Sequence, residues 1–276
     1  MKKIGVLPNI LRDINLEYTK DLVQWLMKKN VSIAVLKEYE NLIPNVNYAT
    51  DIKNICESSD FVVSLGGDGT ILDKAEICAS CDTPLIGINL GGLGYMTDGG
   101  KIDGKVSIQK VLDGEFGIEK RMMIETTIEG TTYKALNDVC VTKGEITKMI
   151  NFDISVNGKY IDSYRADGVI ISTPSGSTAY NISAGGPVLK PDLDAIVITP
   201  ISSHKLYSRS IVVSGDDEVF IDLKNNSNAK AFMSADGKDA VEVNGGVKIV
   251  KSDKKVQIIK TTDVGFYDVL REKLSV

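Results

Sequence analysis

Short apolar runs alternate with amphipathic stretches over roughly the first hundred residues of the chain. Between Leu16 and Lys29 the apolar side chains recur at close to helical spacing, which predicts a helix that buries one face. The apolar runs on either side have the length and composition of buried strands. They lie at Lys3 to Leu7, Val31 to Leu36, Phe61 to Leu65 and Pro84 to Ile88. Strands that alternate with helices in this way predict βαβ units on a parallel sheet.

After Asp98 the pattern changes to short apolar runs separated by turns rich in Gly, Asp and Asn, such as Asn157-Gly158. Turns of this composition between β-type runs predict a β-rich region. The runs lie at Met122 to Ile128, Phe152 to Val156, Gly168 to Ser172 and Val247 to Val250. The stretch Phe266 to Leu274 returns to helical spacing, and we expect this C-terminal helix to pack back on the α/β layer.

The 276 residues are 43% hydrophobic and 25% charged, which is long enough and apolar enough for one large domain or two smaller ones. The change of pattern favours two. We predict an α/β domain with a Rossmann-like parallel sheet, formed by residues 1–99 with 255–276, and a β-rich domain formed by residues 100–254. Short hinges are expected near Asp98 to Lys105 and near Ser252 to Lys255.

The net charge of −5 comes from interspersed acids and bases with no run of Lys or Arg, which argues against a nucleic-acid partner. No stretch of about 18 apolar residues and no signal-peptide pattern is present, so we expect a cytoplasmic protein without a membrane partner. Four cysteines include one C-x-x-C pair, Cys78 and Cys81, but only one histidine and no second pair. They are therefore interpreted as reduced, structural thiols.

The strongest chemical signal is the run Gly66-Gly67-Asp68-Gly69-Thr70, which follows a predicted buried strand and precedes a helix from Ile71. Its glycines permit unusual backbone angles and leave no Cβ to block a ligand from the backbone N–H groups. Thr70 is expected to cap the helix, whose N-terminal partial charge favours a phosphate. The run therefore predicts a phosphate-binding loop; the alternative is a tight turn.

Asp68 separates this loop from commoner phosphate loops. A bare carboxylate repels phosphate unless it holds Mg²⁺ or takes a proton from an attacking hydroxyl. The run also lacks the Lys of a Walker loop and the third glycine of the dinucleotide fingerprint. Asp68 is thus a candidate catalytic carboxylate, against the alternative of a residue that only organises the turn.

The run from Gly66 to Thr70 resembles the G-G-D-G-T loop shared by NAD kinases, diacylglycerol and sphingosine kinases and phosphofructokinases. The loop alone implies phosphoryl transfer and leaves the acceptor open. Further segments resemble NAD kinase motifs, and the last of them is nearly the whole T-P-x-G-S-T-A-Y signature. These segments are Asn89 to Asp98, Leu136 to Asp138, Arg165 to Gly168 and Ser172 to Asn181.

The likeness continues through Pro187, Pro200 to Val213 and Asp236-Gly237, so the chain is similar to the NAD kinase family over most of its length. The family implies transfer of a phosphoryl group to the 2′-hydroxyl of the adenosine ribose of NAD, giving NADP. The donor is ATP or another nucleoside triphosphate or polyphosphate, with Mg²⁺ as the expected divalent metal. The family's two-domain fold, with the C-terminus returning to the first domain, agrees with the organisation predicted above.

By this resemblance Asp68 is the catalytic carboxylate. Asn137 and Asp138 contact ribose hydroxyls or a carboxamide, and Asp167 holds the nicotinamide carboxamide or the nearby ribose. Asn and Asp are also ordinary turn residues, which is the alternative for these three. The adenosine contacts are Thr178, Ala179, Tyr180 and Ser183, for which the alternative is a capped helix start.

The resemblance assigns less to the basic residues. Arg165, Lys205 and Arg209 offset phosphate charge in one interpretation and are solvated surface residues in the other. His204, the one histidine, is either a ligand contact or a hydrogen-bonded structural residue. The family's site lies between domains and often across a subunit contact, which implies a homo-oligomer, a dimer or a tetramer.

The chain departs from the family at three positions: Asp138 replaces Glu, Gly92 replaces a common His, and Ser210 replaces the Pro that follows the arginine. Because the Asp138 side chain is one methylene shorter than Glu, its carboxylate reaches less far toward a ribose hydroxyl. The phosphoryl donor, the choice between NAD and NADH, feedback by NADP(H) and the oligomer size stay open at this point.

Three competing functions agree less well with the sequence. A lipid or sugar kinase of the same superfamily would lack the segment from Ser172 to Pro187. A serine hydrolase would use Ser175 or Ser177 with His204, but no G-x-S-x-G turn is present. A non-catalytic nucleotide-binding regulator would need a defect in the glycine loop, which is intact.

Overall fold

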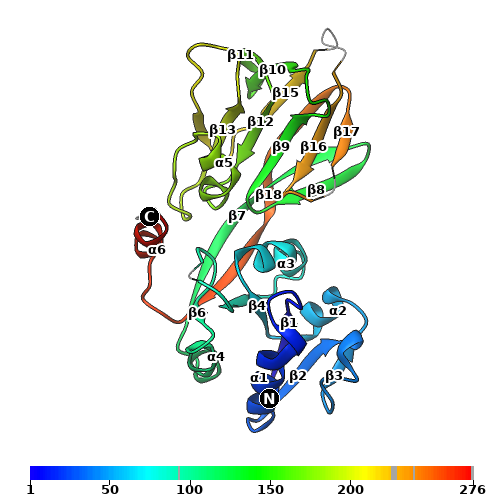
Figure 1. Ribbon diagram of the computed structural model, residues 1–276, viewed down its shortest axis with the longest axis vertical. Coiled ribbons are helices and arrows are strands. Elements are labelled where there is room, and N and C mark those ends of the chain that lie inside the picture. Colours follow the sequence, from blue (N-terminus) through cyan, green and yellow to red (C-terminus); the bar gives the residue numbers. More distant parts are fainter. Residues whose placement is uncertain (93, 225–228, 239, 275–276) are drawn as a thin grey trace. The chain divides into compact units, whose positions relative to one another are not determined.

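The computed structural model describes residues 1–92, 94–224, 229–238 and 240–274 (Figure 1). The chain divides into two compact units, Met1–Lys120 with Val256–Val276 (unit 1) and Arg121–Lys255 (unit 2). Each unit has its own cluster of buried apolar side chains. Residues 100–120, assigned from the sequence to the second domain, lie in unit 1 in this division, because helix α4 (Gly104–Asp113) buries Ile108 and Val111 in the unit 1 core.

Unit 1 contains a parallel sheet in the order β5-β4-β1-β2-β3, which confirms the predicted α/β layer. Every residue of β4 and β5 is buried, as expected for strands covered on both faces. The short strand β6 extends the pairing of β5. The strands are β1 (Lys2–Pro8), β2 (Val31–Leu36), β3 (Asn47–Ala49), β4 (Phe61–Gly66), β5 (Leu85–Asn89) and β6 (Gly99–Gly100).

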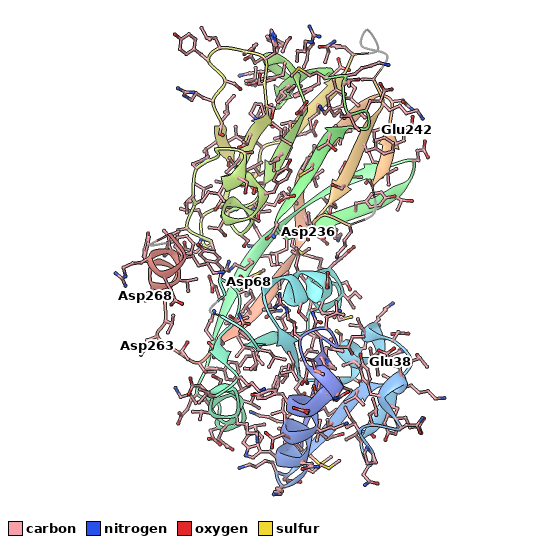
Figure 2. All side chains as sticks on the ribbon, viewed as in Figure 1. Glu38, Asp68, Asp236, Glu242, Asp263 and Asp268 are labelled. Carbon is pink, nitrogen blue, oxygen red and sulfur yellow. The ribbon has the colours of Figure 1, made fainter. Side chains whose placement is uncertain are left out.

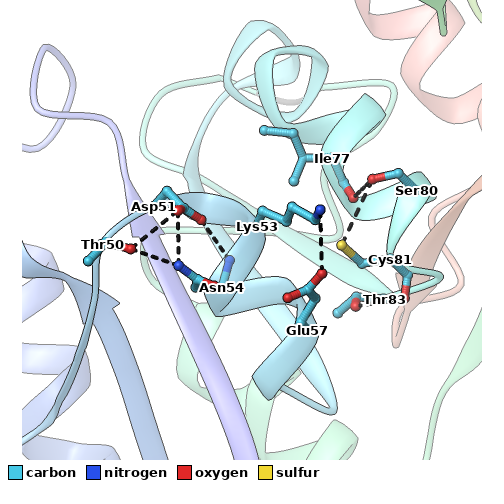
Figure 3. Close-up of polar contacts among 9 residues, drawn as sticks. All are labelled: Thr50, Asp51, Lys53, Asn54, Glu57, Ile77, Ser80, Cys81 and Thr83. Carbon is cyan, nitrogen blue, oxygen red and sulfur yellow. Dashed lines mark hydrogen bonds and ion pairs between the residues drawn. The ribbon is translucent and has the colours of Figure 1, made fainter.

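Two helices of unit 1 begin where an aspartate accepts hydrogen bonds from free backbone N–H groups. Asp13 accepts hydrogen bonds from the N–H groups of Tyr18 and Thr19 at 2.9 and 2.8 Å, at the start of α1 (Glu17–Met27). Asp51 caps α2 (Ile52–Ser58) by accepting from the N–H of Asn54 at 2.8 Å (Figure 3). The remaining helices are α3 (Asp68–Ser80), α4, and the 3-10 turns η1 (Ile14–Leu16) and η2 (Lys37–Tyr39).

Unit 2 is β-rich, as predicted, and its core contains side chains from two sheets. One sheet is antiparallel in the order β14-β13-β12-β9-β16-β17, and the other includes β11-β10-β15-β18 and the β7-β8 pair. Buried and partly buried residues alternate along β10, the period of a half-buried strand. The first strands of this region are β7 (Gly117–Ile128), β8 (Thr131–Ala135), β9 (Asp138–Lys143), β10 (Ile150–Val156), β11 (Lys159–Ala166) and β12 (Gly168–Ser172). The others are η3 (Gly176–Thr178), α5 (Tyr180–Ser183), β13 (Ala195–Ile201), β14 (Ile211–Ser214), β15 (Val219–Leu223), β16 (Ala231–Ala235), β17 (Val241–Val243) and β18 (Gly246–Lys260).

The C-terminal segment belongs to unit 1, as the sequence predicts. Strand β18 ends beside β5, where Ile258 pairs with Leu85. The buried carboxylate of Asp98 then accepts hydrogen bonds from the N–H and the hydroxyl of Thr261, at 2.7 and 2.5 Å. Helix α6 (Phe266–Leu274) follows, and it contacts the segment after β5 through Tyr95. Within the described part of the chain, no helix is both long enough and apolar enough to span a bilayer.

Candidate active site

The glycine loop joins β4 to α3 at the carboxyl end of the parallel sheet. The prediction that Thr70 caps a helix from Ile71 is wrong, because α3 already begins at Asp68 with Gly67 at its N-cap. The two glycines let the chain enter the helix early: a Cβ on Gly66 would lie 2.2 Å from Oγ1 of Thr70. That buried hydroxyl accepts a hydrogen bond from Nδ2 of Asn9 at 2.8 Å. Thr70 therefore packs under the loop.

Asp68 occupies the first turn of α3, where the helix dipole favours a negative charge. Its Oδ2 accepts a hydrogen bond from the N–H of Tyr95, and its Oδ1 accepts from the N–H of Met96, both at 2.9 Å. A Cβ on Gly94 would lie 2.3 Å from Oδ1 of Asp68. The segment after β5 thus fits closely around the carboxylate and fixes its orientation. Leu93, part of the motif quoted above, lies outside the described residues.

A cavity of about 290 Å³ opens beside this carboxylate, and we call it the glycine-loop cavity. Its walls combine glycine backbone, the amide of Asn89 and two cationic side chains. Backbone N–H groups and cationic side chains of this kind bind several anionic oxygens at once. The carboxylate of Asp68 lies among them. The lining residues are Arg12, Gly66, Gly67, Asp68, Asn89, Gly91, Gly92, Gly94 and Lys273, and exposed Gly69 follows Asp68 on α3.

Neither cation of the cavity, Arg12 or Lys273, belongs to a motif found in the sequence. Arg12 follows β1, the neighbour of β4 in the sheet, so its carboxyl-end position is a signal that sequence order could have supplied. Lys273 lies about two hundred residues from the loop in the chain, and nothing in the local pattern relates it to Asp68.

In unit 2 a half-buried carboxylate, that of Asp236, holds the Asn137-Asp138 pair. Asp236, whose position is labelled in Figure 2, accepts hydrogen bonds from three consecutive backbone N–H groups, those of Leu136 at 2.8 Å, Asn137 at 2.7 Å and Asp138 at 3.2 Å. The carbonyl of Asn137 accepts from the N–H of Thr173 at 2.9 Å. Asp236 had appeared in the sequence only as part of the resemblance, and the structure shows that it positions the backbone of the pair.

Asp138 itself is buried, with 6% of its surface exposed. Loss of solvation raises the pKa of Asp138 to about 6, and the nearby charge of Asp236 adds to the rise. The thiol of Cys140, which donates a hydrogen bond to Oδ1 at 3.2 Å, lowers the pKa and opposes these effects. A carboxylate that titrates near neutrality and has few polar partners accepts a hydrogen bond from a ligand hydroxyl readily.

The segment Ser175 to Ser183 packs against this pair. A Cβ on Gly176 would lie 2.1 Å from the carbonyl oxygen of Asn137, so only glycine allows the approach. Buried Asn181 donates to the carbonyls of Ser177 and Pro187 at 3.0 Å each and accepts from the hydroxyl of Thr199 at 2.7 Å. Neither η3 nor α5 has a side-chain cap, which weakens the alternative of an ordinary capped helix start.

Side chains of this segment remain available to a ligand. Tyr180 and Ser183 are exposed, and Thr178 and Ala179 are half-buried. Burial raises the pKa of the Tyr180 hydroxyl, and the negative charges of Asp138 and Asp167 add to the rise. Asp167 is also paired with Lys143 at 2.6 Å. In the β9–β12 pairing Asp138 lies opposite Ser172 at one end of β9, whereas Asp167 lies beside Lys143 at the other end.

The other predicted residues lie elsewhere. Arg165 and His204 line a cavity of about 410 Å³ with Lys205 and Lys224, and Arg209 lines another of about 310 Å³ with four serines. Arg165, His204 and Arg209 are all exposed.

The serine hydrolase hypothesis lacks its central contact. Ser177 is fully buried and donates to the carbonyl of Pro174 at 2.7 Å, while Ser175 accepts from Arg121 at 3.2 Å. Among the residues with described positions, His204 makes no hydrogen bond to either serine.

Comparisons with known proteins agree with this geometry. A model of the ATP-NAD kinase N-terminal domain matches residues 4–116, and one of the ATP-NAD kinase C-terminal domain matches residues 136–261. NAD kinase of Thermoanaerobacter sp. (strain X514) is 40% identical over 100% of this chain and 99% of its own. NAD kinase of Acetivibrio thermocellus is 36% identical over 99% and 97%. The chain belongs to the NAD kinase family.

Two solved structures share the fold. An NAD kinase from Archaeoglobus fulgidus in complex with ATP superposes with a TM-score of 0.81 at 26% identity, covering 99% of this chain and 98% of its own. Yeast NADH kinase complexed with NADH gives a TM-score of 0.87 at 22% identity, covering 100% and 87%. The predicted two-domain fold class, with its returning C-terminal helix, is confirmed.

The raised pKa of Asp138 predicts a pH-dependent stability that Asp138→Asn removes. Because the folded carboxyl has a pKa of about 6 and the unfolded one 3.8, the folded state binds the proton more tightly between these values. The free energy of unfolding should therefore fall as pH rises from about 4 to about 6, by up to about 3 kcal/mol from this group. Urea denaturation from pH 4.5 to 7 should show the wild type losing stability relative to Asp138→Asn. Parallel curves for the two proteins would contradict the assignment.

Proposed function

We propose that this chain is an NAD kinase that transfers a phosphoryl group from ATP to the 2′-hydroxyl of the adenosine ribose of NAD, giving NADP. One observation carries the proposal: Asp68 presents an oriented carboxylate to a cavity of glycine N–H groups and cations, in a chain whose full-length relatives are NAD kinases. The same relatives favour this function over a lipid or sugar kinase with the shared loop.

Asp68 would accept the proton of the 2′-hydroxyl as the new bond to phosphorus forms. Each carboxylate oxygen has two lone-pair positions, so the hydrogen bonds from Tyr95 and Met96 leave room for a hydroxyl. Phosphoryl transfer depends mostly on positioning and on neutralising charge. Backbone N–H groups of Gly66, Gly67 and Gly69 would do this at the N-terminus of α3, with Thr70 as support beneath the loop.

Unit 2 would bind NAD. We assign ribose or carboxamide contacts to Asn137, Asp138 and Asp167, and adenosine contacts to the exposed segment after them. Because Asp236 fixes the backbone of the pair, the carboxylate of Asp138 is held in place as an acceptor for a hydroxyl, which supports a role for Asp138 in place of Glu. The adenosine contacts are Thr178, Ala179, Tyr180 and Ser183.

The remaining assignments stay predictions. Arg165, His204 and Arg209 line other cavities, so their part in NAD binding depends on the expected homo-oligomer. Leu206 and Tyr207, which lie between His204 and Arg209 in the sequence, are exposed apolar side chains, and they support a subunit contact at this segment. The molar mass of the protein in solution tests whether the oligomer forms. Cytoplasmic location is likewise a prediction.

A divalent metal, Mg²⁺ by expectation, fits the glycine-loop cavity if the donor brings it. Among the described residues no group of three or more His, Cys, Asp or Glu side chains is able to hold a metal. Mg²⁺ commonly keeps several waters and binds through substrate phosphates and one or two carboxylates, and Asp68 is the carboxylate available among the described lining residues. Such an ion neutralises charge on the transferring phosphoryl group. Activity in excess EDTA tests the requirement.

Asp68→Asn tests the catalytic assignment. The amide keeps the shape of the side chain but lacks basicity, so kcat should fall about 10²-fold or more while KM for NAD changes little. The amide also places an NH₂ group against a backbone N–H of Tyr95 or Met96, and the melting temperature should drop modestly.

Asp73→Asn is the matched control, because Asp73 is exposed on the same helix. It should leave kcat and melting temperature unchanged. A folded Asp68→Asn enzyme with near-wild-type kcat at saturating Mg²⁺ would defeat the assignment of Asp68 as the base.

Tyr180→Ala tests the adenosine site. Tyr180 would contact a part of NAD remote from the transferring phosphoryl group, so its loss should raise KM for NAD more than it lowers kcat. Tyr180→Phe keeps the ring and should retain most of the affinity if the ring face makes the contact. Initial rates over a range of NAD concentrations measure both effects, and a pure loss of kcat would place the adenosine site elsewhere.

A further inference from the structure

Helix α6 reaches the glycine-loop cavity from the far end of the chain. Lys273, in its last turn, lines the cavity. Nζ of Lys273 lies 5.2 Å from the ring centre of Tyr95, and the ring of Phe266 lies 5.8 Å from the same ring. Both ends of the helix therefore contact the residue whose backbone N–H holds Asp68.

Arg12 brings a second cation from the segment after β1. Its backbone N–H donates to the carbonyl of Asn9 at 3.0 Å, and the N–H of Asn9 donates to the carbonyl of Leu65 at 2.9 Å. Nδ2 of Asn9 donates to Oγ1 of Thr70 at 2.8 Å. The segment that carries Arg12 is thus tied on both sides to the glycine loop.

The charges of both cations remain available to a ligand. In the part of the chain that the structure describes, no ion pair includes Arg12 or Lys273. By contrast, Arg271 of the same helix is paired with Asp268 at 2.6 Å. Asp68 is the one acidic side chain among the described lining residues, so cations outnumber carboxylates. A cavity with this excess, together with backbone N–H groups, favours a ligand that carries several anionic oxygens.

We propose that Lys273 and Arg12 bind the phosphates of the phosphoryl donor, so that the C-terminal helix is part of the donor site. This inference rests on the proposed function and identifies residues that the sequence motifs do not contain. Linked phosphates are common to a nucleoside triphosphate and an inorganic polyphosphate, and both meet the same cations. The ring of Tyr95 beneath the Lys273 ammonium supports that side chain at the cavity through a cation–π contact.

The test measures donor binding without turnover. Calorimetric titration of the full chain with ATP, and separately with inorganic tripolyphosphate, is done in the absence of NAD. Lys273→Gln should raise the Kd of both ligands about tenfold, the usual effect of losing one charge-assisted hydrogen bond. Arg12→Gln should act in the same direction. Lys273→Arg keeps the charge and should stay within about threefold of wild type. In steady-state assays Lys273→Gln should raise KM for ATP and leave KM for NAD unchanged.

Arg271→Gln is the matched control, because it removes a cation from the same helix outside the cavity lining. It should change neither Kd, and all variants should keep the wild-type melting temperature. Unchanged affinity of Lys273→Gln for both ligands would overturn the proposal, as would equal losses in Arg271→Gln. A loss confined to ATP would also overturn it, since Lys273 would then contact the nucleoside. Tripolyphosphate binding that depends on Lys273 without any NADP formation would contradict the proposed function alone.

Discussion

The carboxylate of Asp68 accepts hydrogen bonds from two consecutive backbone N–H groups, those of Tyr95 and Met96, at the start of a helix. Charge-assisted hydrogen bonds of this kind are stronger than neutral ones. They join the carboxyl ends of the two adjacent strands β4 and β5, and they fix one acidic side chain in the glycine-loop cavity. Gly94 is required for this contact, since a Cβ there would overlap the carboxylate. The ring of Tyr95 in turn contacts Phe266 and Lys273 of helix α6.

In unit 2 as well, a carboxylate accepts hydrogen bonds from consecutive backbone N–H groups, but it has a different role. Half-buried Asp236 accepts hydrogen bonds from three consecutive backbone N–H groups and holds the Asn137-Asp138 pair in place. In unit 1 the carboxylate that accepts the hydrogen bonds is itself the candidate base, whereas in unit 2 it supports the residues proposed to bind NAD. Each polar motif is thus fixed through backbone N–H groups. Every residue except proline has such a group, so these hydrogen bonds do not depend on which side chains stand at the donor positions. The course of the backbone therefore determines the orientation of both motifs.

Much of the fold was predictable from local pattern. The runs Val31–Leu36 and Gly168–Ser172 match their strands, because alternating or continuous apolar sequence determines burial locally. The start of α3 was misplaced, since the glycines allow the helix to begin at Asp68 and Thr70 is needed beneath Gly66. Residues 100–120 were assigned to the other domain because α4 looks the same in sequence whichever core it joins.

The candidate site was predictable where a motif is continuous in sequence, as in the glycine loop and Ser172 to Asn181. Arg12, Lys273 and Asp236 were missed as site residues because each acts on a motif about 60 to 200 positions away, and single Arg, Lys or Asp residues carry no local signal. Tertiary contacts alone bring them to their motifs.

The most direct test of the account is the identity of the phosphorylated product. Purified protein is incubated with NAD, ATP and Mg²⁺, and the mixture is analysed by ³¹P NMR together with ADP release. The account predicts a new phosphomonoester on the 2′-oxygen of the adenosine ribose, formed in equal amount with ADP. ADP release without that phosphomonoester, or phosphorylation of a lipid or sugar while NAD stays unchanged, would contradict it.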